Sequence, residues 1–594
     1  YDENGEFVEK LSSGDWNPLV SANLPKRNTS TYTSVQDNFN IDWRIIPALR
    51  LQGRFSYTRQ FDRRDLFKSP ESLDYSTETD PKKKGSYYLV NSRSDRFDGN
   101  LTLAYNKTID KHMLNVGVGS NIMQSETEGE SFTGVGFINP DMIFIGAANA
   151  FQENTSPQGT YDKSRLVGFF TNVNYGYGNR YFLDFSFRSD GSSKFGRNSR
   201  FAPFWSLGVA WNVHNESFWH AHEKNALKLR ASVGSTGTTN FSSTQALTTY
   251  LYDFSREYNG NFGVSLAGYG NSSLKWQTTL SYNVGVDFTF LHGLVVFNGD
   301  FYIKNTRSLL LPVTVAPSTG FIDYVENIGK LRNTGVEARL RFNLIQDAVK
   351  DLRWNVTLSA FHNRSKITQL SNQLETINQY ANDDRANQGT VVYRQFEAGR
   401  SQTALMVVRS GGIDPATGNE IYIKRNGEMT FEYNHNDKIE CGDMKPKIEG
   451  NVNTNLNWKG FNLYMLFKYQ YGGKIYNVTL ASKVEGANPL KNADKRVLYD
   501  RWKEPGDHAK FRRIDDTSAP YQTTRLVFDN NLLALQSVSL SYELPRKISQ
   551  KMYMERVKLL LSSTDLFRLS SVKQERGTSY PFARTFSIGL NVTF

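Results

Sequence analysis

The sequence contains one cysteine, Cys441, and only 17 prolines in 594 residues. A single thiol excludes an internal disulfide and any metal site built from several cysteines. Long hydrophobic runs are also absent, because no apolar stretch approaches the ~18 residues of a membrane-spanning helix. The formal net charge is +11, yet no run of basic residues stands out beyond residues 82–84. The lack of long apolar runs excludes a helical membrane protein. The sequence also contains no recognised motif for binding nucleic acid.

The sequence is instead rich in aromatic residues and in segments where apolar and polar residues alternate. Phe, Tyr and Trp make up 13% of the chain. Apolar side chains recur at every second position along most of its length; in 282–290, for example, Tyr282, Val284 and Val286 alternate with Asn, Gly and Asp. Successive side chains of a strand point to opposite faces, so this period predicts β-strands with one apolar and one polar face. The sequence therefore predicts an all-β fold.

The connections between these segments alternate in length. Short links lie near 46–47, 107–111, 178–180, 291–293 and 459, and somewhat longer ones lie at 214–225, 345–352 and 545–556. Long polar loops lie at roughly 59–95, 122–165, 189–203, 235–279, 305–333, 362–447, 472–531 and 566–583. Short periplasmic turns and long extracellular loops are typical of a transmembrane antiparallel β-barrel, with strands of about 9–11 residues. A soluble propeller or stacked sandwiches remain the alternative, but they leave the loop asymmetry unexplained.

The chain ends on an alternating segment. Phe586, Ile588, Leu590, Val592 and Phe594 are apolar, and the residues between them are small or polar. This ending resembles the signal read by the outer-membrane barrel assembly machinery, and the terminal strand is expected to close the barrel. About seventeen strands are visible, whereas closed bacterial barrels have even numbers and plugged transporters have about 22. We therefore expect residues 1–594 to be the C-terminal part of one barrel, with further strands and a plug before Tyr1.

An ordered set of motifs resembles one family. "NRYFLDFSFRSDGSSKFGRNSRFAPFWSLGVAWNV" (179–213) is similar to the strand–DGSS–strand hallmark of SusC/RagA-like TonB-dependent transporters of Bacteroidetes. "LKLRASVGSTG" (227–237), "NIGKLRNTGVEARL" (327–340), "GGIDPATGNEIY" (411–422) and "YPFARTFSIGLNVTF" (580–594) follow in the expected order. The resemblance covers nearly the whole chain.

The resemblance implies a function. It implies an outer-membrane importer of nutrient oligomers, glycan or peptide, energised through TonB and working with a SusD-like surface lipoprotein. It implies no enzymatic chemistry and no cofactor. Two alternatives stay open: a TonB-dependent receptor for siderophores or cobalamin, and an adhesin or barrel enzyme. The sequence contains no nucleophile elbow or other catalytic arrangement.

Charged residues on the polar side of the predicted strands form the first group of candidate site residues. They are expected to line the wet lumen, where they contact substrate or plug, or pair across strands along the wall. Both signs occur on strands predicted to be neighbours, which favours the wall and plug-docking interpretation. The group comprises Asp184, Arg188, Lys228, Arg230, Asp287, Asp300, Lys304, Glu337, Arg339, Arg341 and Lys468.

Loop residues form the second group. Aromatic side chains that are candidates for stacking on sugar rings, or for packing against a lipoprotein or their own loops, are Tyr250, Tyr252, Phe254, Tyr258 and Trp276. The family motif Asp190, Gly191, Ser192 and Ser193 is predicted to be a turn in which Gly supplies a positive φ. Residues 414–418 also predict a turn, and its carboxylate and carbonyls are a possible Ca²⁺ site with few acidic ligands. No other metal site is predicted, because His220 and His222 match no zinc spacing.

Overall fold

The computed structural model describes most of the chain. Its described residues are all of 1–594 except 1–4, 6–7, 9–16, 154, 156, 197–198, 221–223, 240–245, 269, 315–322, 328, 371–377, 379–395, 488–493, 517, 519 and 573–583. His222 lies outside them. No helix of the described residues is long and apolar enough to cross a membrane.

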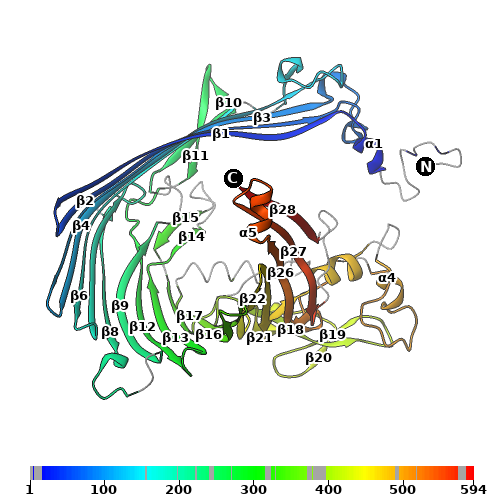
Figure 1. Ribbon diagram of the computed structural model, residues 1–594. Coiled ribbons are helices and arrows are strands. Elements are labelled where there is room, and N and C mark those ends of the chain that lie inside the picture. The colour runs from blue at the N-terminus through cyan, green and yellow to red at the C-terminus, as the bar shows by residue number, and fades with distance from the viewer. Residues whose placement is uncertain are drawn as a thin grey trace.

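Within the described residues, 18 strands form one antiparallel sheet that curls into a wide arc (Figure 1). Seventeen of them pair in chain order, and the two-residue β5 (Ala150–Phe151) joins the end of β4. The seventeen are β1 (Lys26–Ile46), β2 (Leu49–Lys68), β3 (Ser86–Ile109), β4 (His112–Val135), β6 (Gln158–Tyr177), β7 (Tyr181–Ser192), β8 (Phe201–Asn212), β9 (Ala226–Thr238), β12 (Gln277–Phe290), β13 (Val295–Arg307), β16 (Lys330–Asp347), β17 (Leu352–Gln369), β22 (Ile448–Trp458), β23 (Phe461–Tyr471), β26 (Leu532–Glu543), β27 (Arg556–Ser570) and β28 (Thr585–Thr593). The predicted fold class and strand number are confirmed.

The short links lie where the alternation predicts them. β6 and β7, for example, are joined by three residues, of which Gly178 (φ 58°) and Asn179 (φ 55°) take the left-handed conformation. Glycine and asparagine adopt this conformation at the lowest cost, and it suits a tight hairpin. The turns at one rim of the sheet are therefore short, as expected of the periplasmic side of a barrel.

The long polar loops are shorter than predicted. Residues 59–68 and 86–95 were expected in a loop, but they continue β2 and β3, and β3 and β4 each reach 24 residues. About 9–11 residues cross a bilayer, so these strands extend far beyond it. The prediction was wrong because apolar alternation stops where lipid stops, whereas backbone pairing continues. Arg59, which pairs with Asp95 at 2.6 Å, is polar on the face that is apolar lower down.

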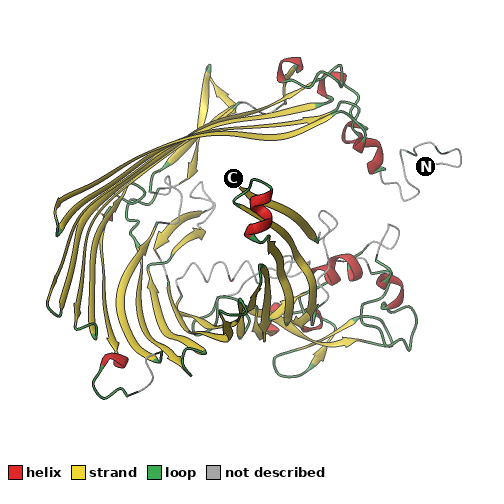
Figure 2. Cartoon of the chain, in the orientation of Figure 1, coloured by secondary structure: helices red, strands yellow, loops and turns green. Residues whose placement is uncertain are grey.

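The remaining long loops contain structure of their own, and strands dominate the described residues, which include only a few short helices (Figure 2). The loop strands are β10 (Thr249–Tyr258), β11 (Asn261–Gly268), β14 (Leu310–Thr314), β15 (Asp323–Asn327), β18 (Ala404–Ile413), β19 (Glu420–Ile423), β20 (Met429–Thr430), β21 (Lys438–Asp443), β24 (Lys474–Tyr476) and β25 (Val527–Asp529). The helices are α1 (Pro18–Ala22), α4 (Arg496–Tyr499), α5 (Arg546–Lys551) and the single turns η1 (Leu73–Tyr75), η2 (Pro81–Lys83), η3 (Ile145–Ala147), η5 (Val213–Asn215), η7 (His435–Asp437), η8 (Leu480–Glu485) and η9 (Thr524–Leu526).

The buried cores lie in the loops and at the strand ends next to them. The largest is built from Leu405, Tyr476, Ala481, Val484, Val497, Phe511 and Leu526. Smaller clusters form around Phe137 and around Trp276. Within the membrane a barrel strand has lipid on one side and a lumen on the other, so these cores form in the loops and at the strand ends that continue into them, such as Phe67 of β2 and Tyr87 of β3.

The C-terminal strand lies at one edge of the sheet. Phe586, Ile588, Leu590 and Phe594 all have most of their side-chain surface exposed, and Val592 is opposite Val557 of β27. Among the described residues β28 has a pairing register only with β27, and β1 only with β2. Closure by the terminal strand, and its role as an assembly signal, therefore remain predictions.

Candidate functional site: the inner wall and the loops above it

Strand register sorts the side chains of the sheet onto two faces. Opposed residues share a face, so Val284 lies beside Phe301 of β13 and Ala231 of β9, and Phe301 lies beside Val336. This series continues from β7 to β28 as one apolar face. The other face is polar. In a transmembrane barrel the apolar face meets lipid, and the polar face is the inner wall of the lumen.

Arg230 is the centre of a charged cluster on the inner wall. Its guanidinium donates to Asp287 on β12 at 2.9 Å and to Asp300 on β13 at 3.1 Å. Gly285 lies between them, where an added Cβ would be 2.5 Å from an Asp300 oxygen and 2.7 Å from an Arg230 nitrogen. The absence of a side chain at Gly285 therefore leaves room for the guanidinium of Arg230 to bridge two carboxylates across three strands.

The other predicted wall residues from β9 to β16 also lie on this face, and with this cluster they form the charged sector of the wall. The ammonium of Lys228 lies 5.5 Å from the ring centre of Phe182, and that of Lys304 lies 4.5 Å from the ring centre of Tyr302. Glu337, Arg339 and Arg341 are exposed on β16. Within the described part of the chain these three side chains form no ion pair.

Three predicted wall residues lie outside this sector. Asp184 accepts a hydrogen bond from Asn174 at 2.6 Å, and Lys468 lies on β23 opposite Asn451. Arg188 donates to Asp190 and, at 2.8 Å, to Asn121 of β4. The structure thus brings Arg230, Asp287 and Asp300 into contact within the charged sector, and it places Asp184, Arg188 and Lys468 elsewhere on the wall.

The DGSS motif is not the turn that its composition predicts. Asp190, Gly191 and Ser192 continue strand β7, and Gly191 has no positive φ. An added Cβ at Gly191 would lie 2.6 Å from the ring of Phe201, so the glycine is explained by close packing between β7 and β8. Asp190 is buried and accepts from Arg188, and the Ser193 hydroxyl accepts from the backbone N–H of Arg165.

Sequence reasoning missed a second sector of the inner wall. On β22 every inward position from 451 to 457 is asparagine. The Asn462 amide donates to Asn457 at 2.6 Å and to Asn455 at 3.0 Å. Hydroxyls continue the stripe across the next strands. We call it the amide–hydroxyl sector; it consists of Asn355, Ser359, Asn451, Asn453, Asn455, Asn457, Asn462, Ser537, Ser539, Ser541, Ser562 and Ser587. The alternate asparagines of "NVNTNLN" were the available signal.

A buried network of ion pairs lies in the loops that contain β18, β19 and β24. Arg525 donates to Glu485 at 2.8 Å and to Glu420 at 2.9 Å, and Arg512 donates to Glu485 at 2.9 Å. Both carboxylates are fully buried. Glu420 also accepts from the Thr523 hydroxyl at 2.6 Å. The two carboxylates raise the pKa of Arg525 above its usual range, outweighing the opposite effect of burial.

Other titratable groups in these loops respond to burial. Burial lowers the pKa of Lys438 to about 8 and raises the pKa of Tyr422 and of Tyr476. Tyr433 and Tyr521 stack with ring centres 4.2 Å apart beside Tyr422. The loops are thus a packed unit with a fixed interior.

The aromatic candidates differ in their exposure to solvent. Trp276 is only 6% exposed, stacks on Phe195 at 4.6 Å and donates its indole N–H to the Arg200 carbonyl. Its prediction as a substrate-stacking residue was wrong, because it packs its own loops. Tyr250 is 65% exposed on β10. Tyr252, Phe254 and Tyr258 lie on the same strand, but their side chains are outside the described part of the structure.

The 414–418 segment is a turn, as predicted. Gly418 has φ 72° and donates its N–H to the Asp414 carbonyl at 2.8 Å. The Thr417 hydroxyl donates to the Asp414 carboxylate and holds its pKa below the usual range. Among the described residues no group of three His, Cys, Asp or Glu side chains is placed to hold a metal. Ca²⁺ in the loops remains a prediction.

A wide antiparallel sheet with an apolar outer face and a polar inner wall is the geometry of a large outer-membrane β-barrel. The family model described as "TonB dependent receptor-like, beta-barrel" matches residues 3–427. The chain belongs to this family, and it is a barrel of the bacterial outer membrane.

Individual relatives agree with the family. The chain is 25% identical to TonB-dependent receptor P3 of Formosa agariphila over 100% of its own length and 61% of that protein. It is 26% identical to TonB-dependent receptor SusC of Bacteroides thetaiotaomicron over 62% of its length and 37% of SusC. The structure of the RagAB peptide transporter superposes with a TM-score of 0.82 at 21% identity, covering 96% of this chain and 62% of that one. The chain thus spans about three fifths of the length of receptor P3 and of the RagAB chain.

Proposed function

We propose that the chain is the barrel of an active importer of nutrient oligomers, glycan or peptide, energised through TonB. The observation that carries the proposal is the family membership, joined to the likeness to relatives named TonB-dependent receptor along the whole chain. RagAB is named as a peptide transporter, which supports an oligomeric solute.

The width of the sheet supports a large solute. A barrel of about eight strands is filled by its own side chains, whereas about 22 strands enclose a lumen that needs a plug. The seventeen strands of the described residues already form a broad arc, and polar side chains predominate on the inward faces of β9, β12 and β22. A wide polar lumen suits a hydrated oligomer, and no bond of the solute has to be broken in passage.

The packed loops support a partner at the outer surface. A rigid interior around Arg525 gives the loops a constant shape, which suits repeated docking of a SusD-like lipoprotein. We propose such a lipoprotein as the partner that captures the oligomer. The proposed function is therefore transport rather than catalysis.

Two experiments test the proposal. Growth on the cognate oligomer is expected to stop when either this gene or the TonB system is deleted, and TonB-independent growth would refute active import. The complex purified gently from native outer membranes is expected to contain a lipoprotein at equal stoichiometry and a bound glycan or peptide. A lone barrel carrying an iron chelate would instead establish a siderophore receptor.

A further inference from the structure

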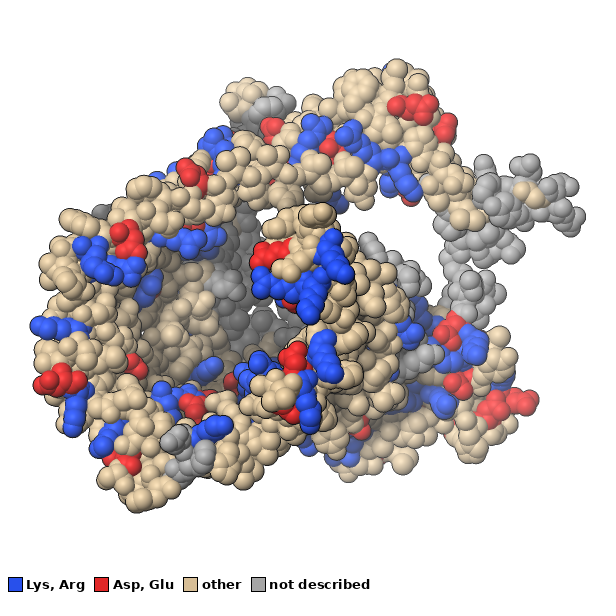
Figure 3. Space-filling view, viewed as in Figure 1, with Lys and Arg blue, Asp and Glu red and all other residues tan. Residues whose placement is uncertain are grey.

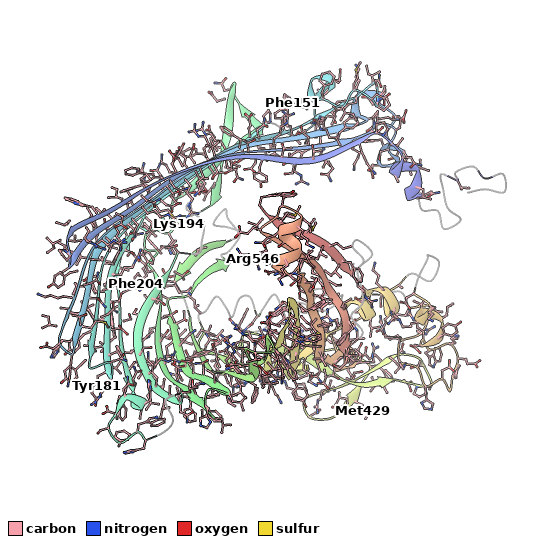
Figure 4. The ribbon with its side chains drawn as sticks, viewed as in Figure 1. Phe151, Tyr181, Lys194, Phe204, Met429 and Arg546 are labelled. Carbon is pink, nitrogen blue, oxygen red and sulfur yellow. The ribbon has the colours of Figure 1, made fainter. Side chains whose placement is uncertain are left out.

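A hollow whose lining includes five basic and two acidic side chains lies at the periplasmic end of the inner wall. It has a volume of about 740 Å³ and lies where the turns after β16, β22 and β26 meet. Figure 3 shows Lys and Arg gathered on α5 and the adjoining turn, and Figure 4 places Arg546 on that helix. The charged residues of this basic hollow are Arg353, Lys459, Arg546, Arg556 and Lys558, with Asp351 and Glu543.

Register places the hollow on the lumen side. Arg353 lies opposite Asn457, and Asn457 lies opposite Asn462, so all three lie on the polar face. Glu543 and Lys558 are opposed on β26 and β27, on the same face as Ser541. The hollow is therefore the periplasmic end of the amide–hydroxyl sector.

Positive charge exceeds negative charge in the hollow. Arg556 pairs with Glu543, but within the described residues Arg353, Arg546 and Lys558 form no ion pair. A second hollow, of about 390 Å³, shares Arg353 and adds Arg341, which extends the basic surface along the wall. The periplasmic hollow beside β3 and β6 differs, because Asp110 accompanies Lys111 and Arg180 there and Arg180 pairs with Glu216. The excess of positive charge is thus specific to the side of the lumen formed by β17, β22 and β26.

We propose that the basic hollow is an anion-binding exit site for the transported oligomer, taking its carboxylate or sulfate groups. This inference rests on the proposed function and adds a substrate class to it: an anionic oligomer. The amide–hydroxyl sector above offers hydrogen bonds of both polarities without fixed charge, so a polar chain can exchange partners along it. Basic side chains at its lower end attract the anionic groups toward the periplasm.

Charged thiol reagents test the local potential in the full-length protein, purified in detergent. Asn457→Cys is introduced into a background in which Cys441 and any other cysteine of the full-length protein are replaced by alanine. The anionic reagent methanethiosulfonate ethylsulfonate is compared with its cationic trimethylammonium analogue. We expect the anionic-to-cationic rate ratio to be about ten-fold higher than at a Thr108→Cys reference beside β3, from a few unpaired charges at ~7 Å screened by 0.15 M salt.

Neutralising the hollow provides the matched comparison. Arg353→Gln with Lys558→Gln is expected to bring the ratio at position 457 to that of the reference, whereas Lys107→Gln with Lys111→Gln, beside β3 at the same periplasmic rim, is expected to leave it unchanged. A wild-type ratio equal to the reference, or no reaction at 457 with either reagent, would overturn the proposal.

Protection by a ligand tests the substrate class. Tetragalacturonate is expected to slow the reaction of both reagents at position 457, and its neutral methyl ester is not; the Arg353/Lys558 double variant is expected to lose this protection. No protection by tetragalacturonate refutes an oligomer site, and equal protection by inorganic phosphate at matched charge refutes selection of an oligomer. These outcomes are independent of TonB-dependent growth, so failure of the proposed function is recognised separately.

Discussion

Replacing Arg525 with methionine is the sharpest test of the loop architecture. The side chain is 11% exposed, and it lies between Glu420 and Glu485, whose carboxylates are fully buried. Arg525→Met leaves Glu420 without its only ion-pair partner among the described residues and leaves Glu485 with Arg512 alone. Removing one partner of a buried ion pair typically costs about 3–5 kcal/mol. We expect the free energy of local unfolding of these loops to fall by that amount.

Backbone hydrogen exchange measures this free energy. Amides of β18 and β24 are expected to exchange at least about 100-fold faster in the variant, because about 3 kcal/mol corresponds to roughly two orders of magnitude. Amides of β12, in the membrane, are expected to be unchanged. The matched control is Arg513→Met, because Arg513 pairs with the exposed carboxylate of Asp515. An exposed pair contributes at most about 1 kcal/mol. Equal effects of the two substitutions would refute the argument that burial of the network stabilises the loops.

Three further predictions concern pH, the membrane face and assembly. Burial holds the pKa of Lys438 at about 8, against 10.5 unperturbed, so the unfolded state binds more protons between these values and loop stability is expected to rise with pH from about 8 to 10.5. Lys438→Met is expected to stabilise the loops by up to about 3 kcal/mol at pH 7 and by little at pH 10.5. A difference in proteolysis rate between the two proteins that does not change with pH would contradict this. Val286→Arg on the lipid face is expected to destabilise the barrel by roughly 2–4 kcal/mol in denaturant unfolding, whereas Lys228→Ala on the inner wall is expected to cost far less; equal costs would reverse the face assignment. Deleting Phe594 is expected to lower the surface level of the protein, and a normal level by surface labelling would exclude its role in assembly.

The barrel strands could be predicted because lipid imposes a simple rule on each residue. Every second side chain from Tyr282 to Phe290 has to be apolar, so the pattern is written locally in the sequence. The same rule fails where the strands leave the membrane. Arg59 and Asp95 continue the ladder with charged side chains, and these have the composition of a loop.

The site was predicted less completely because its contacts join distant residues. Arg525 meets a glutamate 105 positions away, and no spacing in the sequence indicates that meeting. Gly191 was read as a turn residue, whereas its role depends on the ring of Phe201 across the strand pair. The asparagines of β22 were visible as an alternating run, but alternation of amides has no established meaning until neighbouring strands place Asn462 beside them.

The long strands β1 to β4 and β6 extend from the lipid bilayer into water. Below, in lipid, Phe39 and Phe55 stack on their outer face; above, Arg93 joins Asp95 to Glu128 on that same face. Contacts between apolar side chains in lipid have no charge for salt to screen, whereas exposed ion pairs weaken as ionic strength rises. One continuous ladder therefore has an upper part whose stiffness follows the ionic composition of the medium and a lower part that does not. The ionic strength outside the bacterium can therefore change the stability of the extracellular ends of these strands, while their membrane-spanning parts keep the same stability.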